Sequence, residues 1–136
     1  MSRRGSRSIV VIGLLLAACS HGSSPPVAPA TVPAADVQAE ALLQAALSAA
    51  AAYYVSGGTY VGFGDDASLL EPGVAWNRNP AAVVGQVSVR GESAQSVALV
   101  TKSTSGAVFC IGLSGMGGTT KGRQDAPGAA ACSGGW

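Results

Sequence analysis

A run of hydrophobic residues with helical spacing, from Asp36 to Tyr54, constrains the fold of this chain more than any other feature. The hydrophobic residues recur about every three to four positions, and polar residues such as Glu40 follow the opposite side. The residues on the hydrophobic side are Ala39, Leu42, Leu43, Ala46, Leu47, Ala50, Tyr53 and Tyr54. Asp36 suits the positive end of the helix dipole, and Gly57 and Gly58 supply a stop signal. The pattern predicts an amphipathic helix over residues 36–54.

The period changes to two in the second half of the chain. Residues 59–80 carry no period and are rich in Gly, Asp, Asn and Pro, which indicates a long loop with one or two short turns. Hydrophobic and polar residues then alternate over 83–90. Residues 96–102 follow as a second predicted strand and 107–113 as a third, which places Phe109, Ile111 and Leu113 on one face, with short polar connections between the strands. Such runs are typical of an antiparallel meander. The predicted fold class is α+β, with one N-terminal amphipathic helix packed on a small antiparallel sheet.

The beginning of the chain has the order of an export signal. Residues 1–8 are basic, residues 9–16 are apolar, and two alanines precede Cys19. This order is typical of a secretory signal peptide, here residues 1–18. A membrane-spanning helix needs about 20 apolar residues, so this apolar run is too short to cross a bilayer.

Residues 16–19, Leu-Ala-Ala-Cys, resemble the lipobox of bacterial lipoproteins. The resemblance implies that Cys19 receives a diacylglyceryl group and becomes the new N-terminus. Two or three acyl chains anchor a protein stably, at about 0.8 kcal/mol per buried methylene. We therefore expect lipid anchoring in the cell membrane, with the protein facing the extracytoplasmic side. Ordinary cleavage beside an incidental cysteine is the alternative. Arg3 and Arg4 also raise a twin-arginine export signal, although residues 5–7 lack the apolar pair expected after it.

Residues 19–35 join the lipidated cysteine to a segment rich in Ser, Pro and Ala. Such a segment has too few large apolar groups to repay the loss of chain entropy on folding, and its prolines favour extended geometry. We interpret it as a flexible tether that precedes a folded domain of residues 36–136. The single histidine, His21, lies in this tether. Catalysis of the Ser-His-Asp or Cys-His type needs a positioned imidazole, which the domain therefore lacks.

Two glycine-rich stretches approach known motifs without completing them. Residues 112–116 are similar to a nucleophile elbow but have Met116 where a glycine belongs. Residues 115–122 lack the Gly-Lys-Ser/Thr order of a phosphate-binding loop before a helix. We therefore predict no catalytic residue, no cofactor and no enzymatic activity.

The charge distribution argues against nucleic acid as a partner. The formal net charge is +1, but the residues after Cys19 hold five Lys and Arg against seven Asp and Glu. Phosphate binding needs clustered cations. The cations of the domain are scattered along the chain at Arg78, Arg90, Lys102, Lys121 and Arg123.

The chain holds three cysteines, which is an odd number for an exported protein. If Cys19 is lipidated, Cys110 and Cys132 remain as a candidate disulfide pair. This bridge would hold the Gly-, Ala- and Ser-rich tail of residues 114–136 and contribute roughly 3 kcal/mol. A free pair or a metal-binding pair is the alternative, although two thiols with no histidine nearby make poor zinc ligands.

From about residue 36 onward the chain resembles the globular domain of type IV pilins and of the related pseudopilins of type II secretion. The resemblance rests on Tyr-Tyr and Gly-Gly-Thr-Tyr within residues 53–60, on Phe-Cys-Ile in the third strand, and on Cys132 near the end. It implies a pilin-like head stapled by Cys110 and Cys132. The long apolar N-terminal helix that packs pilin filaments has no counterpart in this sequence. We therefore expect a non-enzymatic interaction or adhesion module on a lipid anchor, with envelope, pilus or secretion-apparatus proteins as partners.

Asp65, Asp66 and Glu71 form the only cluster of carboxylates, and Trp76 follows close by. Together they make a possible binding loop, with which the protein would be a small ligand-binding protein or an enzyme. The carboxylates lack the spacing of a calcium loop, so no metal site is predicted. The simpler interpretations are a solvated turn for the carboxylates and a loop tryptophan folded onto the sheet.

Overall fold

The computed structural model describes residues 31–136. The predicted signal peptide at 1–18, Cys19 and the tether as far as residue 30 lie outside the described residues. Between residues 31 and 136, no helix combines the length and the apolar content that crossing a membrane requires.

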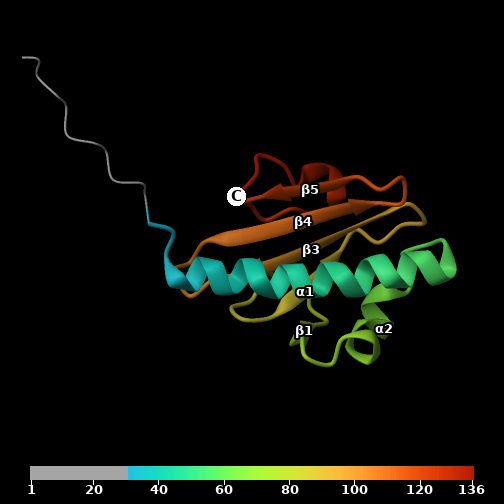
Figure 1. Cartoon of the computed structure of the whole chain (residues 1–136), viewed down its shortest axis with the longest axis horizontal. Coiled ribbons are helices and arrows are strands. Elements are labelled where there is room, and N and C mark those ends of the chain that lie inside the picture. The colour runs from blue at the N-terminus through green and yellow to red at the C-terminus, as the bar shows by residue number, and fades with distance from the viewer. Residues whose placement is uncertain (1–30) are drawn as a thin grey trace, which may run out of the picture. The chain divides into compact units, whose positions relative to one another are not determined.

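Two α-helices, a five-stranded sheet and one short 3-10 helix make up this part of the chain (Figure 1). The elements are α1 (Ala34–Gly57), α2 (Phe63–Leu70), β1 (Trp76–Asn77), β2 (Val87–Arg90), β3 (Ser96–Lys102), β4 (Val108–Ser114), β5 (Thr119–Gly122) and η1 (Ala129–Ala131). The strand order is β1-β2-β3-β4-β5. The α+β class is confirmed. The prediction of a purely antiparallel sheet is wrong, because β1 pairs in parallel with β2.

The helix α1 is longer than the sequence pattern predicts. It runs from Ala34 to Gly57, so the predicted start at Asp36 and end at Tyr54 are not matched, and the helix lies inside the chain rather than at its N-terminal end. The extension adds Ala34 and Ala35 at the start, where alanine is the strongest helix former, and residues 55–57 at the end. Gly58 ends it with a left-handed φ of 67°, and its N–H donates to the Tyr54 carbonyl at 2.7 Å.

The face of the sheet against which α1 packs is termed the inner face. The buried hydrophobic residues of α1 are Ala39, Leu43, Ala46, Ala49 and Ala50. They meet the strands β3 and β4, whose buried hydrophobic residues on this face are Val97, Leu99, Phe109, Ile111 and Leu113. The alternation of the sequence predicts this face of β4 correctly. Most of the helix side of this contact is alanine, and α1 runs across one face of the sheet (Figure 1).

The opposite, outer face of the sheet is covered by the C-terminal tail. Val100, Cys110, Ala126 and Cys132 form a second buried cluster there. The disulfide Cys110–Cys132 is present, with 5.8 Å between its Cα atoms. Gly112 allows the tail to come close, since a Cβ atom at this position would lie 2.6 Å from the Ala129 carbonyl oxygen. The predicted disulfide that holds the tail is confirmed, and this cluster, β5 and η1 hold the tail as well.

The segment predicted as a long loop holds the helix α2 and the short strand β1. Phe63 and Ala67 of α2 are buried, and the Phe63 ring meets Tyr53 edge-to-face at 5.5 Å. Asp65 and Asp66 occupy the first turn of α2, where the helix dipole favours negative charge. A helix of eight residues with two buried side chains is too short to show a period in the sequence.

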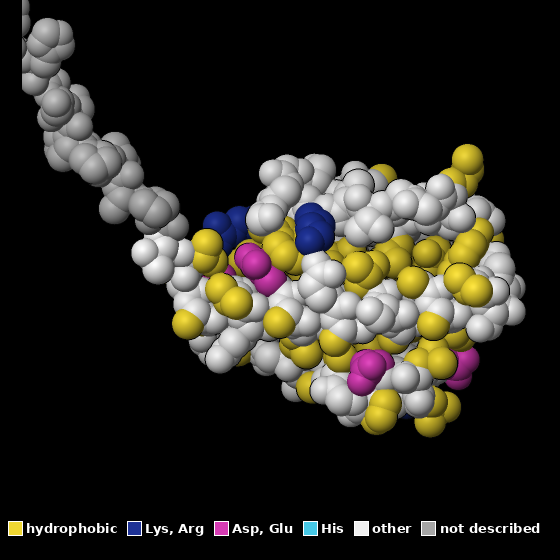
Figure 2. All heavy atoms as spheres, in the orientation of Figure 1, with side chains coloured by type: hydrophobic (Ala, Val, Ile, Leu, Met, Phe, Trp, Pro, Cys, Tyr) yellow, Lys and Arg dark blue, Asp and Glu magenta, His cyan; other side chains and the backbone are white. Residues whose placement is uncertain are grey.

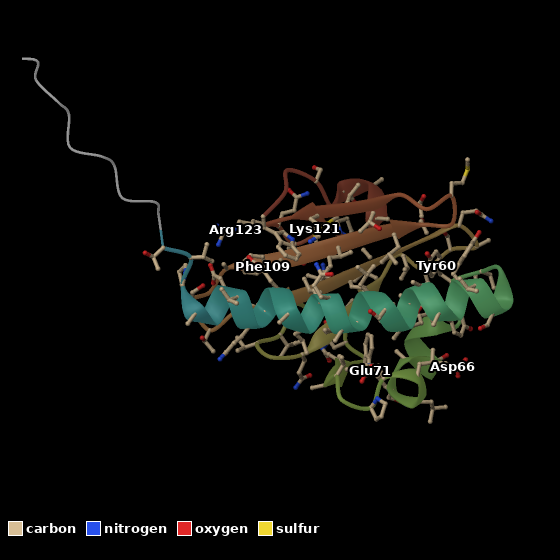
Figure 3. The ribbon with its side chains drawn as sticks, in the orientation of Figure 1. Tyr60, Asp66, Glu71, Phe109, Lys121 and Arg123 are labelled. Carbon is tan, nitrogen blue, oxygen red and sulfur yellow. A yellow bond between two sulfur atoms is a disulfide. The ribbon has the colours of Figure 1, made fainter. Side chains whose placement is uncertain are left out.

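The start of α1 is fixed to the sheet through the buried carboxylate of Asp36. This side chain accepts hydrogen bonds from Ser103 at 2.7 Å, from Ser105 at 2.6 Å and from the Arg123 guanidinium at 2.5 Å. Ser103 and Ser105 belong to the turn between β3 and β4, and Arg123 follows β5, near Phe109 in Figure 3. The hydrogen bond from Ser105, then that from Ser103, and the charge of Arg123 lower the pKa of Asp36, although burial opposes them.

Removing the disulfide should destabilise the domain substantially. Replacing Cys110 and Cys132 together by Ala is expected to lower the free energy of unfolding by about 3 kcal/mol, because the bridge restricts the unfolded chain. Urea denaturation of the oxidised wild type and of the double variant measures this difference. The reduced wild type is the matched control and should behave like the variant. Equal stability of the oxidised and reduced wild type would contradict the expectation.

Replacing Asp36 by Asn should destabilise the domain at neutral pH but not in acid. The pKa of Asp36 in the folded state lies below its ordinary value of 3.8. The carboxylate therefore stabilises the fold fully above that pH, and this contribution is lost as the pH falls through the lowered pKa. Urea unfolding of the wild type and of Asp36→Asn should give stabilities that converge below pH 3.8. Glu40→Gln on the same helix is the control; a difference for Asp36→Asn that stays constant with pH would refute the role of the charge.

Candidate functional site

A hollow of about 260 Å³ lies between α2, β1 and β2. Its lining residues are Gly64, Asp65, Ser68, Trp76, Asn77, Arg78, Val89 and Glu92. They come from one side of α2, from β1 and the residue after it, from β2, and from the turn after β2. It is termed the α2–β1 hollow.

Trp76 has a fixed position in the wall of this hollow. Its indole N–H donates to the Glu71 carbonyl at 2.9 Å, and its ring meets Phe63 edge-to-face with centroids 5.6 Å apart. The side chain is half-buried, so it packs against the core and also borders the hollow. The ring thus packs against the protein core, as the simpler interpretation expects, and its role as a binding aromatic stays a prediction.

Asn77 and Glu92 are also held by hydrogen bonds. The Asn77 amide donates to the Ser88 hydroxyl at 3.1 Å and to the Ala81 carbonyl at 3.0 Å. Glu92 accepts the backbone N–H groups of Gly62 at 3.1 Å and Gly64 at 2.5 Å, at the start of α2. These N–H groups have no partner within the helix, so Glu92 acts as a cap supplied from a distant turn.

The rim of the hollow differs from its walls. Asp65, Ser68 and Arg78 are exposed. Within residues 31–136, their side chains make neither a hydrogen bond nor an ion pair. The α2–β1 hollow thus combines wall residues that the fold has already oriented with polar groups that are free to bind a ligand.

Of the predicted binding loop, the structure brings together Asp65 and Trp76 only. Glu71 instead closes its own turn, accepting the Gly73 N–H at 3.2 Å. The pKa of the Tyr53 hydroxyl is raised mainly by burial and next by the negative charge of Asp66, which lies nearby. In Figure 3 both Asp66 and Glu71 lie on the α2 side of the domain, but neither lines the hollow.

Sequence reasoning missed Ser68, Arg78 and Glu92. Arg78 follows Trp76 by two positions, and in an extended segment two such residues lie on the same face. A predicted strand at residues 76–78 would therefore have indicated Arg78 as a site residue. Ser68 lies one helical turn after Gly64 and depends on recognising α2. Glu92 gave no signal, because it comes from a turn far from α2 in the sequence.

A second, apolar groove of about 570 Å³ lies between the C-terminal half of α1 and the hairpin of β4 and β5. Its lining residues are Leu47, Ala51, Tyr54, Val55, Gly58, Tyr60, Leu113, Ser114, Gly115, Gly117, Gly118 and Thr119. The rings of Tyr54 and Tyr60 stack within it at 4.7 Å, and burial, followed by the proximity of Tyr54, raises the pKa of Tyr60. Val55 at its edge is 85% exposed, and Met116 in the hairpin turn is 94% exposed. Figure 2 shows hydrophobic side chains on the surface between α1 and this hairpin.

The described part of the chain contains no group of three or more His, Cys, Asp or Glu side chains that could hold a metal ion. Cys110 and Cys132 are joined to each other, which excludes the alternative of a free or metal-binding pair. The polar chemistry of the α2–β1 hollow is therefore that of the carboxylates, hydroxyl, amide and guanidinium that line it.

No family model matches the chain, and neither the curated proteins nor the solved structures gave a match.

Replacing Glu92 by Gln should loosen the start of α2. The variant loses the negative charge at the helix N-terminus and one acceptor, at a cost of about 0.5–1 kcal/mol. Amide hydrogen exchange at Gly62 and Gly64 should become about twofold to fivefold faster. Glu71→Gln, at the other end of α2, is the control and should leave these two amides unchanged. Unchanged exchange in Glu92→Gln would show that this carboxylate does not cap the helix.

Proposed function

We propose that this protein is an exported lipoprotein, anchored to the cell membrane through Cys19 and facing the extracytoplasmic side. Its domain is a pilin-like, non-enzymatic interaction or adhesion module. Residues 1–18 are then the signal peptide, and residues 19–35 connect the anchor to the domain.

The pairing of Cys110 with Cys132 is the observation that carries this proposal. It accounts for two of the three cysteines and leaves Cys19, the one with a lipobox before it, without a partner in the domain. A buried structural disulfide also suits a protein that folds outside the reducing cytoplasm.

Three features of the domain support its pilin-like character. A long helix packs on the inner face of the sheet, a Gly-Gly-Thr-Tyr segment leads away from the end of that helix, and a disulfide ties the C-terminal tail to β4. The apolar groove, with exposed Val55 in its lining, supports an interaction role, because a groove lined mostly by apolar side chains is a surface that a partner can bury. Envelope, pilus or secretion-apparatus proteins are the partners that this proposal implies.

A second candidate function is the binding of a small ligand by the domain itself. The observation that favours it is the α2–β1 hollow, which is lined by Asp65, Trp76, Arg78 and Glu92 together.

Replacing Cys19 by Ala should release the protein from the membrane fraction and remove the mass of the acyl groups. The reason is that the acyl groups on Cys19 are the anchor in this proposal, and within residues 31–136 no helix is long and apolar enough to span a membrane. Cell fractionation and intact-mass measurement check both effects. The double variant Cys110→Ala and Cys132→Ala is the matched control, since it also removes thiols but should keep the acyl mass and the membrane location. An unchanged location and mass for Cys19→Ala would refute the lipid anchor.

A further inference from the structure

We propose that the α2–β1 hollow is a carbohydrate-binding site that takes one ring of a neutral oligosaccharide. The site lies on the domain and does not depend on how Cys19 is modified. The proposal follows from the division of its lining into fixed walls and a free polar rim.

Trp76 provides the surface on which a sugar ring would stack. One face of a pyranose ring is formed by C–H groups and packs favourably against an aromatic ring, much as other apolar groups do. The hydrogen bond to the Glu71 carbonyl and the contact with Phe63 already hold the indole in place. Binding would therefore cost little side-chain entropy at this residue.

The rim supplies the hydrogen-bonding groups that sugar hydroxyls need. A hydroxyl both donates and accepts, and neighbouring hydroxyls suit the two oxygens of a carboxylate or the two N–H groups on one side of a guanidinium. Asp65 accepts, Arg78 donates, and Ser68 does both. None of the three is engaged with another residue in the part of the chain that the structure describes, so a ligand need not displace an existing protein contact.

The charges around the hollow favour a neutral ligand. Asp65 and Arg78 carry opposite charges on the same rim. The charge of Glu92 is directed to the N–H groups of Gly62 and Gly64 at the positive end of α2. An anion or a cation would thus meet a like charge, whereas a polyhydroxyl compound would find an acceptor and a donor.

The size of the hollow limits the ligand to a short contact. Pockets that enclose drug-sized molecules have volumes of about 300–1,000 Å³, and the α2–β1 hollow is slightly smaller, at about 260 Å³. One sugar ring would be seated in it, while the rest of an oligosaccharide extends along the surface. Affinity in the millimolar range is expected from so small a contact.

Saturation-transfer NMR on the full chain tests this proposal directly. The probes are cellotetraose, mannotetraose and the tetramer of N-acetylglucosamine, each added separately. At least one should show saturable transfer, strongest at the C–H protons of a single ring. Absence of transfer with all three probes would overturn the proposal.

Two variants in the rim of the hollow and one control variant outside it test which residues bind the probe. Asp65→Asn and Arg78→Ala should each weaken binding of the active probe by at least about tenfold, because each removes a charged hydrogen bond. Asp66→Asn makes the same charge change one residue away, outside the hollow, and should leave binding within about twofold. Since these residues are exposed, the variants should stay folded. Equal binding by all three variants would overturn the assignment to this hollow.

Tryptophan fluorescence provides an independent measurement. Trp76 and Trp136 are the two tryptophans of the chain, so Trp136→Phe leaves Trp76 as the sole reporter. The active probe should shift the emission of Trp76, and this shift should saturate with the same affinity as in the NMR titration. An unchanged emission at a saturating concentration of the probe would contradict stacking on Trp76. Glycine, a zwitterion that matches Asp65 and Arg78 but has no ring to stack, should cause no shift. A saturable shift with glycine would replace the carbohydrate by an amino-acid ligand and overturn the proposal.

Discussion

The packing of α1 on β3 and β4 is the contact on which the rest of this domain depends. The helix contributes mainly alanine side chains, and the strands contribute larger apolar side chains such as Phe109 and Leu99. The last turns of α1 then present Tyr53 and Tyr54 on two sides. Tyr53 meets Phe63 and so positions α2, whereas Tyr54 stacks on Tyr60 in the apolar groove. Both candidate binding regions therefore owe their shape to the place where this helix ends.

The two faces of the sheet are closed in different ways. The inner face is covered by a regular element, whose burial is carried by apolar side chains. The outer face is covered by an irregular tail that has few large apolar groups and is held by the Cys110–Cys132 bridge. Trp136 packs on the inner-face cluster instead, since its ring lies against Phe109, and its indole N–H donates to the Cys110 carbonyl at 3.1 Å. A small domain with so little aromatic content gains from a covalent link of this kind.

The sequence predicts those elements whose apolar residues form a helical stripe or a short apolar run between polar turns. β3 has the predicted bounds and β4 is shifted by one residue, because each is such a run, with its interior positions buried on both faces of the sheet. β5 was missed, since its Thr-Thr-Lys-Gly sequence has no apolar residue to alternate. The site was predicted only where its residues are neighbours along the chain: Asp65 and Trp76 flank one short segment. Arg78 depends on recognising β1, and Glu92 reaches α2 by tertiary folding alone.

The length of α1 sets a distance within the domain. Its 24 residues span about 36 Å at the usual helical rise. The chain enters the domain at one end of this rod, beside Asp36, and Val55 and Tyr60 border the apolar groove at the other. The helix thus works as a rigid spacer, which keeps the Asp36 cluster of hydrogen bonds and the apolar groove at opposite ends of the domain.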